Sequence, residues 1–447
     1  MTATRIVCSG CGATPEERDP YPFRCPRAGS DDADHVMVRM LDPSRVAFPE
    51  DEAESNPFLR YRSLFHAHRL ASEAGLSDEM YCSIVRELDR AVEDVDGRGF
   101  SATPFARADA LSSALRLSDR GGVWVKDETG NVSGSHKGRH LMGLLIHLEV
   151  AERVGLADPD ARRPLAIASC GNAALAAAVV ARAGERPLQV FVPVDADPVV
   201  VRRLEELGAH IVVCPREPGV PGDPTYRTLQ EAVDSGAVPF TCQGNLNGLA
   251  IEGGETIAYE MASDLAASGE TLDHLVVQVG GGALASACAQ GLREAVELGV
   301  LPGLPRIHTV QTEGAHPLER AYARVRAELP DEPSQEEIDR ALRRAAERRS
   351  EYMWPWEKEP KSVATGILDD ETYDWRAVVH GMLSSGGRPV VVDEELLVDA
   401  NRLAAESTGI PVDATGSAGL AGVMALRAEG AIEHDDRVAV LFTGTTR

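Results

Sequence analysis

Short hydrophobic runs alternate with longer runs of mixed polarity from about residue 120 to the end of the chain. The short runs are almost continuously apolar, which is typical of strands buried on both faces of a parallel sheet. Between them, leucines repeat at helical spacing, as in the run 141–148. This alternation predicts a doubly wound α/β fold. The predicted strands lie at 123–126, 164–168, 188–192, 211–213, 275–279, 307–310, 389–392 and 438–442.

The first 120 residues follow a different pattern. Residues 1 to about 50 are rich in Cys, Pro and Asp and show no long periodicity, whereas residues 57–95 have the spacing of helices. We therefore expect a small cysteine-containing head followed by two α/β halves. The expected boundaries are 1–50, 51–270 and 271–447.

Composition narrows the possible partners and chemistry. The formal net charge of −25 argues against nucleic acid or an anionic membrane, because both would repel the chain. We find no apolar run long enough to span a bilayer and no secretory signal pattern. Eight scattered cysteines suit reduced thiols in a cytoplasmic protein better than a disulfide scaffold. Only four lysines occur against 41 arginines, so imine chemistry has few candidate positions.

One of these lysines, Lys137, follows the small-residue loop 129–136 and begins the helix that contains Leu141. A helix start carries positive potential, which disfavours an ammonium group and favours the uncharged amine. Imine formation and proton transfer both require that uncharged form. The alternative is an ordinary surface lysine at the start of a helix.

A glycine run follows the predicted strand 275–279. The residues that open the next helix are Gly280, Gly281, Gly282, Ala283 and Leu284. Consecutive glycines let several backbone N–H groups point inward, and the positive potential of a helix start then favours a phosphate. A tight strand-to-helix turn without a ligand explains the run about as well.

Polar residues follow two other predicted strands. Ser169, Cys170 and Asn172 stand between strand 164–168 and an alanine-rich helix, at the edge where open α/β sheets bind ligands. These side chains could hold a carboxylate and a phenolic oxygen, although helix capping by Asn172 would be a sufficient explanation. Thr443 ends the last strand, where its hydroxyl could face a ring nitrogen or simply end the strand.

In this order, the pieces resemble the fold-type-II pyridoxal-phosphate enzymes. That group includes threonine synthase, serine/threonine dehydratases, the cysteine-synthase group and tryptophan synthase β. The resemblance covers roughly residues 100–447 and is closest to threonine synthase-like proteins. It rests on Val125–Glu128 with Gly134–Arg139, on Ser169–Asn172, on Leu249–Glu260, on the glycine run and on Thr443.

The resemblance implies a role for each group. Lys137 would form the imine with pyridoxal 5'-phosphate, and Asn172 would face the O3′ atom of that cofactor. The glycine run would hold the phosphate, and Thr443 would face the pyridine nitrogen. The residues expected to bind the substrate are Ser133, Ser135, Arg139, Ser169 and Cys170.

The head resembles the zinc-ribbon head of some threonine synthases and cysteate synthases. It carries Cys8, Cys11 and Cys25, but Ala28 stands where a fourth cysteine is expected. His35 could complete a Cys₃His site. A degenerate, metal-free knuckle is the interpretation we favour from the sequence, with the three cysteines as possible ligands.

The chain departs from threonine synthases within the lysine loop, where Ser133, His136 and Gly138 replace a threonine, a phenylalanine and an aspartate. The resemblance therefore implies the reaction class but not the substrate. The implied activity is that of a lyase of amino-acid metabolism. It would eliminate or replace a β or γ leaving group, a hydroxyl or a phosphate, through an external aldimine, with Lys137 as the base at the α-carbon.

Other functions stay open. The near alternative is a serine/threonine dehydratase or a β-replacing synthase of a specialised pathway. A pyridoxal-binding regulatory protein without turnover is the non-enzyme alternative. A Rossmann dehydrogenase is disfavoured because no GxGxxG motif follows the first strand. The resemblance also implies a homodimer.

Overall fold

A computed structural model describes residues 3–29, 31–50, 53–216 and 223–446 of the chain. The chain divides into two compact units, each assembled from separate segments. Unit 1 comprises residues 1–27, 36–102 and 131–256. Unit 2 comprises residues 28–35, 103–130 and 257–447. Helix α9 (Ala250–Ser268) contributes its first residues to unit 1 and the rest to unit 2.

Unit 1 begins with an antiparallel hairpin of β1 (Thr4–Cys8) and β2 (Met37–Leu41). Its main sheet has four parallel strands in the order β7-β6-β5-β8. These strands are β5 (Leu165–Ala168), β6 (Leu188–Val192), β7 (His210–Val213) and β8 (Val238–Pro239). The helices are α1 (Pro57–Arg60), η1 (Arg62–Leu64), α2 (His66–Glu73), α3 (Asp78–Asp96), η2 (Val132–Gly134), α5 (Lys137–Arg153), η3 (Pro159–Ala161), α6 (Asn172–Ala183), α7 (Pro198–Glu206) and α8 (Pro224–Asp234).

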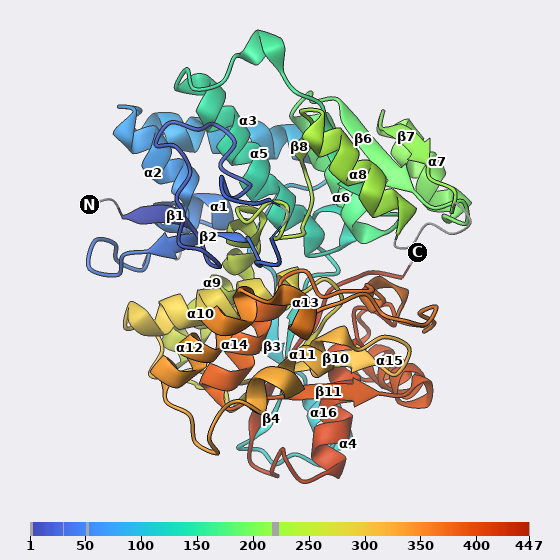
Figure 1. The fold of residues 1–447 in the computed structure, drawn as a ribbon. Helices are drawn as coiled ribbons and strands as arrows, with labels where there is room; N and C mark the ends of the chain where they lie inside the picture. The colour runs from blue at the N-terminus through green and yellow to red at the C-terminus, as the bar shows by residue number, and fades with distance from the viewer. Residues whose placement is uncertain (1–2, 30, 51–52, 217–222, 447) are drawn as a thin grey trace. The chain divides into compact units, whose positions relative to one another are not determined.

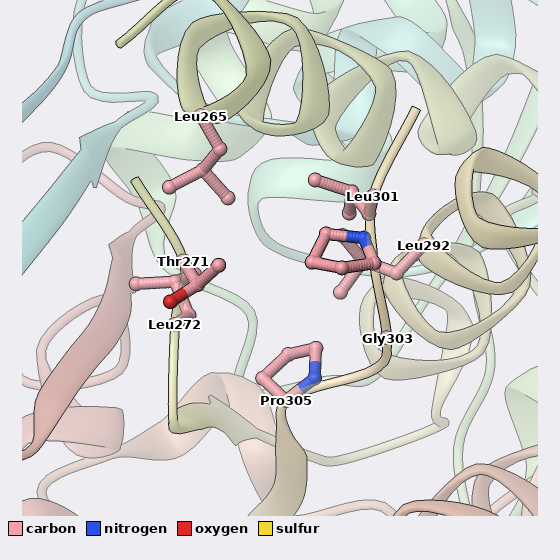
Figure 2. A pocket seen from close by; sticks show the side chains of 8 residues that line it. Leu265, Thr271, Leu272, Leu292, Leu301, Gly303 and Pro305 are labelled. Atoms are coloured by element: carbon pink, nitrogen blue, oxygen red, sulfur yellow. The ribbon is translucent and has the colours of Figure 1, made fainter. Parts of the chain in front are cut away.

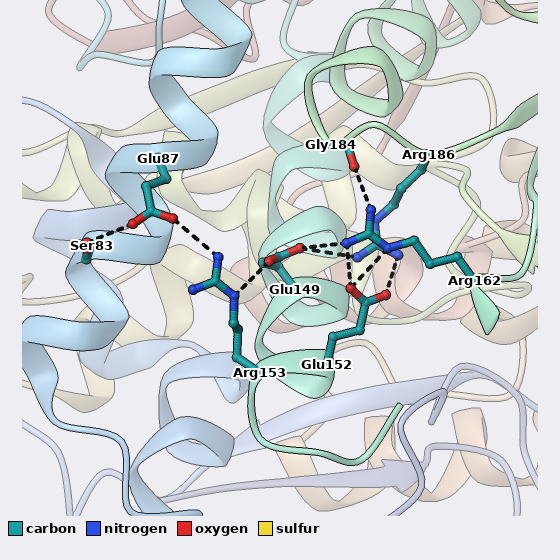
Figure 3. A network of polar contacts seen from close by, with 8 residues as sticks. All are labelled: Ser83, Glu87, Glu149, Glu152, Arg153, Arg162, Gly184 and Arg186. Carbon is teal, nitrogen blue, oxygen red and sulfur yellow. Dashed lines mark hydrogen bonds and ion pairs between the residues drawn. The ribbon is translucent and has the colours of Figure 1, made fainter. Parts of the chain in front are cut away.

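Local sequence accounts for the ends of these helices. In α3, the Ser77 side chain accepts a hydrogen bond from the Met80 N–H, and Gly97 ends the helix with φ +80°. Helix α5 is packed against α2, α3 and α6, and thirteen of its residues are buried. Figure 3 shows the ion pairs at the polar end of α5. Glu149 and Glu152 pair with Arg153, Arg162 and Arg186.

Unit 2 is built on a six-stranded sheet in the order β11-β10-β9-β12-β4-β3. All neighbours are parallel except β3 and β4. The strands are β3 (Phe105–Arg107), β4 (Gly122–Asp127), β9 (His274–Gln278), β10 (Arg306–Thr312), β11 (Pro389–Val392) and β12 (Arg437–Phe442). The helices are α4 (Asp109–Ala114), α10 (Ala283–Glu297), α11 (Pro317–Arg326), α12 (Gln335–Ala346), α13 (Arg349–Tyr352), η4 (Thr365–Ile367), α14 (Trp375–Ser385), α15 (Glu394–Thr408) and α16 (Ala418–Ala428).

Helices of unit 2 form two groups around this sheet (Figure 1). Helices α4, α15 and α16 pack together, and α16 contacts β9, β10, β11 and β12. Helices α10, α12 and α14 form the other group, with α10 against β9 and α14 against β10. The core between α16 and the strands contains Val276, Val310, Val440 and Leu420, all fully buried. This arrangement confirms the predicted doubly wound α/β fold.

The sheet order brings together strands that are far apart in sequence. Strand β12 lies between β4 and β9, with Val440 paired to both Val125 and Val276. Because these strands are parallel, their carboxyl ends meet at one edge of the sheet. That edge therefore carries the glycine run after β9 and Thr443 after β12. Across the described residues, every helix is either too short or too polar to cross a membrane.

Candidate active site

The loop before Lys137 has an unusual backbone. Ser133 has φ 58° and Gly134 has φ 70°, so a serine occupies the left-handed region that side chains rarely adopt. The Ser133 N–H donates to the Asp96 carboxylate of α3 at 2.9 Å, which helps to hold this conformation. Strained residues that the surroundings hold in place often lie at functional sites.

Lys137 is the first residue of α5, as the sequence predicts. The preceding residue, His136, makes no side-chain cap, so the backbone N–H groups of the first turn keep their positive potential. The lysine is partly exposed, and its amine has no hydrogen-bond or ion-pair partner among the described residues. Ser135, two residues before Lys137, is fully buried, and its hydroxyl also lacks a hydrogen-bond partner among the described residues.

The next residues of α5 attach the lysine to helix α9. The buried Arg139 guanidinium donates to Thr256 Oγ1 at 2.9 Å. His140 Nδ1 lies 2.7 Å from the Ala250 carbonyl. Burial, with the nearby Lys137 charge, lowers the His140 pKa to about 3, so this imidazole is neutral at pH 7. A neutral donor to a carbonyl fixes the first turn of α5 without adding charge.

The second predicted loop lies at the carboxyl end of β5. Ser169 and Asn172 are partly buried, and Cys170 is exposed. Asn172 is the first residue of α6, whereas Gly171 takes the cap position and makes no side-chain bond. Helix capping by the Asn172 side chain, the alternative drawn from the sequence, is therefore not what this loop does. Unit 1 thus holds the lysine loop and the asparagine loop, each at the start of a helix.

The glycine run of unit 2 is a tight turn between β9 and α10. Gly282 has φ +99° and caps α10. The carbonyls of Gly280 and Gly281 accept bonds from the Thr372 hydroxyl and the Asp374 N–H, both at 3.0 Å. With its carbonyls engaged there, the turn presents backbone N–H groups and the positive start of α10 to an anion. Ala283 and Leu284 belong to the first turn of this helix, as predicted.

Thr443 directly follows β12 and is buried. Its Oγ1 atom lies 2.7 Å from Nε2 of Gln278, the last residue of β9. That amide nitrogen also lies 2.9 Å from the Gly416 carbonyl. Because an amide nitrogen only donates, the Thr443 oxygen is the acceptor of this bond. Gln278 was not among the site residues predicted from the sequence, although a polar residue in an otherwise apolar strand was a usable signal.

Asp369 was also not predicted as a site residue. Its carboxylate lies against the glycine turn: a Cβ atom added at Gly280 would overlap the Asp369 Oδ2 atom, and one added at Gly281 would lie 3.8 Å from Oδ1. The ring of Tyr373 covers Gly281 in the same way, with Cδ2 at 2.8 Å from such a Cβ. Glycine is therefore required at both positions by the packing of the 366–374 segment. No periodicity in the sequence marks this contact.

A second lysine, Lys126, lies in β4 and is fully buried. Its Nζ atom donates to Glu260 Oε2 at 2.5 Å and to the Thr103 carbonyl at 2.7 Å. An ammonium held by these partners is not available for imine formation. Lys358 and Lys361, the other two lysines, follow the Trp356 segment and are exposed. Lys137 is therefore the lysine best placed for imine chemistry.

Unit 2 also contains an apolar hollow, shown in Figure 2, on the opposite edge of the sheet. Its lining comes from segments that precede β9 and β10, at the amino ends of those parallel strands. None of the lining residues is titratable. The hollow is lined by Leu265, Thr271, Leu272, Leu292, Leu301, Pro302, Gly303 and Pro305. It offers no chemistry and lies away from the carboxyl edge that carries the glycine turn.

The chain is similar to known proteins over most of its length. The family model described as Pyridoxal-phosphate dependent enzyme matches residues 98–444. Threonine synthase from Methanocaldococcus jannaschii is 25% identical over 346 residues, which cover 76% of this chain and 74% of that protein. A second relative, threonine synthase from Halalkalibacterium halodurans, is 26% identical over 334 residues, which cover 73% of this chain and 79% of that protein.

The fold is similar to solved structures of lower identity. Maize serine racemase superposes with a TM-score of 0.58 at 18% identity, covering 82% of this chain and 93% of that one. The processed form of threonine deaminase isoform 2 from Solanum lycopersicum superposes with a TM-score of 0.57 at 16% identity, covering 84% of this chain and 92% of that one. At these identities the likeness concerns the fold alone.

Proposed function

Since the chain belongs to the pyridoxal-phosphate dependent enzymes, we propose that it is a lyase of the threonine synthase and dehydratase type. Its cofactor is pyridoxal phosphate, as the family implies. The proposed reaction removes or replaces a hydroxyl or phosphate on the β or γ carbon of an amino acid. The proposal rests on the relatedness to threonine synthases and on one observation in unit 2, the neutral hydroxyl of Thr443.

The residues of this chain fit the cofactor. Within the described residues, the Lys137 amine has no hydrogen-bond or ion-pair partner, and the buried hydroxyl of Ser135, two residues earlier in the chain, has none either. The turn from Gly280 to Gly282 offers backbone N–H groups at the start of α10, which is the donor set that a phosphate monoester requires. We propose that Lys137 binds the cofactor aldehyde covalently, and that this turn, with Ala283 and Leu284, binds the phosphate.

The Thr443 hydroxyl supports elimination or replacement as the type of reaction. Gln278 donates to its oxygen, and a hydroxyl that accepts one hydrogen bond can also donate one, for which an unprotonated pyridine nitrogen is a suitable acceptor. A carboxylate in this place would instead favour a protonated ring. When bound, the cofactor supplies delocalisation for the electron pair left at the α-carbon. By donating to the ring nitrogen rather than charging it, the Thr443 hydroxyl would favour loss of a leaving group over transamination.

The other proposed roles concern the amino acid itself. Lys137 Nζ takes the α-proton, because a lysine amine placed next to the reacting carbon is a suitable base. Asn172 faces the O3′ atom of the cofactor, and Ser169 and Cys170 bind the substrate carboxylate at the start of α6. We also propose three residues of the lysine loop for substrate binding, Ser133, Ser135 and Arg139. The Arg139 guanidinium is buried and donates to Thr256.

A substrate panel tests the proposal. The purified holoenzyme is mixed with serine, threonine and homoserine, each with and without an O-phosphate. Release of phosphate, ammonia and 2-oxo acid is measured together with the visible absorbance of the cofactor. We expect one hydroxy or O-phospho amino acid to change the absorbance and to lose its leaving group. Alanine, which has no leaving group, is the control and is expected to give no product.

The pattern of products separates the alternatives. Turnover that requires the phosphate supports a threonine synthase-like reaction, and turnover of free serine or threonine supports a dehydratase. An unchanged absorbance with every compound, in a protein with the cofactor bound, would overturn the lyase proposal in favour of a regulatory protein. We also propose that the enzyme works in the cytoplasm and that it forms a homodimer. Light scattering of the holoenzyme tests the dimer.

A further inference from the structure

The first residues of α9 include a glycine pair that the proposed reaction does not use. These two glycines lie directly against the start of α5, the helix that begins with Lys137. A Cβ atom added at Gly253 would lie 2.1 Å from the Arg139 carbonyl oxygen, and one added at Gly254 would lie 2.2 Å from Cε1 of His140. No side chain fits within such distances, so the two helices touch through these glycines.

Hydrogen bonds fix the position of this contact. The Arg139 guanidinium donates to Thr256 Oγ1 at 2.9 Å, and the Thr256 hydroxyl donates in turn to the Gly253 carbonyl at 2.8 Å. His140 Nδ1 donates to the Ala250 carbonyl at 2.7 Å. The side chains of this set are fully buried, so water does not compete for the bonds. They attach α5 to α9 directly after the first residues of α5.

Strand β2 of the N-terminal head holds the other side of the α9 start. Arg39 in β2 pairs with Glu252 through Nε at 3.2 Å and with Glu255 through Nη2. All three side chains are only 1–3% exposed. A Cβ atom added at Gly248, two residues before α9, would lie 1.5 Å from the Met37 carbonyl oxygen. The start of α9 is therefore packed between β2 and α5.

Stability alone is the simpler explanation for buried ion pairs of this kind. Unit 1 contains a second buried arginine, Arg186, which pairs with Glu149 and Glu152 at the opposite end of α5 (Figure 3). That network lies far along the helix from Lys137. The Arg39 network differs because the α9 residues it holds also contact the turn that begins with Lys137.

We propose that Arg39 is a positioning residue for Lys137 and acts through Glu252, Glu255 and the start of α9. The ion pairs fix α9 on β2, and the glycine contact then fixes the first turn of α5. A reacting group displaced by about 1 Å can lose about 100-fold in rate, so the support of this turn matters for chemistry. The inference rests on the proposed attachment of the cofactor to Lys137 and extends it to a residue of the head.

Two matched variants separate positioning from stability. Arg39→Met and Arg186→Met each remove a buried arginine that holds two carboxylates. Both should unfold at a lower urea concentration than the wild type, because each leaves buried carboxylates without their cation. Only Arg39→Met should change the behaviour of Lys137.

Two measurements on the full-length protein, after removal of the cofactor, report on the lysine turn. Hydrogen–deuterium exchange with mass spectrometry should be faster in the peptide 137–145 of Arg39→Met than in that of Arg186→Met or the wild type. When pyridoxal phosphate is added, its covalent attachment should be about 10-fold slower in Arg39→Met, as followed by visible absorbance. Arg186→Met should attach the cofactor at the wild-type rate.

Thr256→Val gives a milder test, which still applies if Arg39→Met does not fold. It removes the acceptor of the Arg139 guanidinium while keeping the volume of the side chain. Cofactor attachment should be about 10-fold slower, and kcat with the best substrate of the panel should fall more than KM rises. Thr256→Ser restores the hydroxyl and should restore both rates.

Borohydride reduction of the wild-type holoenzyme distinguishes the two possible failures. A label on a lysine other than Lys137 would overturn the proposed attachment and this inference with it. With the label on Lys137, wild-type exchange and attachment rates in Arg39→Met or, where that variant does not fold, in Thr256→Val would overturn the positioning role alone. Equal slowing in Arg39→Met and Arg186→Met would overturn it too, because a general loss of stability would then explain both.

Discussion

Two lysines eleven positions apart lie in opposite environments. Lys126 is fully buried in β4, with its ammonium bonded to Glu260 and to the Thr103 carbonyl. Lys137 is partly exposed at the start of α5, and its amine has no partner in the described part of the chain. The same side chain thus forms a buried ion pair in one region and stands at an open helix start in the other. Removing one partner of a buried ion pair is costly, so we expect Lys126 to matter for stability and Lys137 for the proposed chemistry.

The largest expected effect comes from Lys137→Ala. Turnover should fall by at least about 10³-fold, because the variant loses both the covalent attachment of the cofactor and the base at the α-carbon. Borohydride reduction followed by peptide mass spectrometry should find no labelled lysine. Lys361→Ala, at an exposed lysine, is the matched control. A label on Lys126 in the wild type would reverse the assignment of the two lysines.

Lys126→Ala tests whether the buried ion pair of Lys126 stabilises the fold. It leaves the Glu260 carboxylate buried without its cation, which should lower the free energy of unfolding by about 3–5 kcal/mol. Urea unfolding of the holoenzyme measures this loss. The double variant Lys126→Met with Glu260→Gln removes both charges and should recover much of the stability. If the single variant unfolds at the same urea concentration as the wild type, the ion pair does not support the fold.

Thr443→Val keeps the volume of the side chain but removes its hydroxyl. Turnover should fall about 10- to 100-fold, since the Gln278 amide loses an acceptor and the proposed ring nitrogen loses a donor. Thr443→Ser restores the hydroxyl and should restore most of the activity. Steady-state rates with the best substrate of the panel, together with the absorbance maximum of the bound cofactor, provide the measurement. Equal rates for the valine and serine variants would exclude a role for this hydroxyl.

Buried histidines of unit 1 should make stability depend on pH. Burial lowers the His147 pKa to about 4, and an unfolded histidine titrates near 6.5. Between these values the unfolded chain binds more protons, so the folded state loses stability as the pH falls below 6.5. At pH 5 the loss from this residue should be about 2 kcal/mol relative to pH 7.5. Urea unfolding at both pH values should show a smaller difference in His147→Gln, but not in the exposed His434→Gln.

The smallest expected effect concerns Asp369. Its carboxylate lies against the glycine turn, where it would repel a bound phosphate. Asp369→Asn should therefore raise the affinity for pyridoxal phosphate by about 3- to 10-fold, measured by absorbance titration of the cofactor-free protein. Asp370→Asn, at the next residue, is the control. A weaker affinity in Asp369→Asn would mean that this carboxylate supports the turn instead.

Much of the fold could be predicted because it depends on local patterns. Continuous apolar runs predicted the parallel strands of both sheets except the two-residue β8, and leucine spacing predicted α5. The lysine loop and the glycine run were also visible, since each needs small residues next to a helix start. The hairpin of β1 and β2 was not predicted, because two short strands separated by a long irregular connection have no common periodicity.

The sequence by itself determined the class of fold and the family, and it pointed to Lys137 as the candidate imine lysine. Only the tertiary structure placed Lys126 in a buried ion pair, because its partner Glu260 lies 134 positions away in the chain. It also supplied Gln278 as the partner of Thr443, and it placed Asp369 on the glycine turn. Patterns in sequence report interactions between near neighbours. The environment of a polar side chain depends on which distant segments pack around it, and no single residue type encodes that.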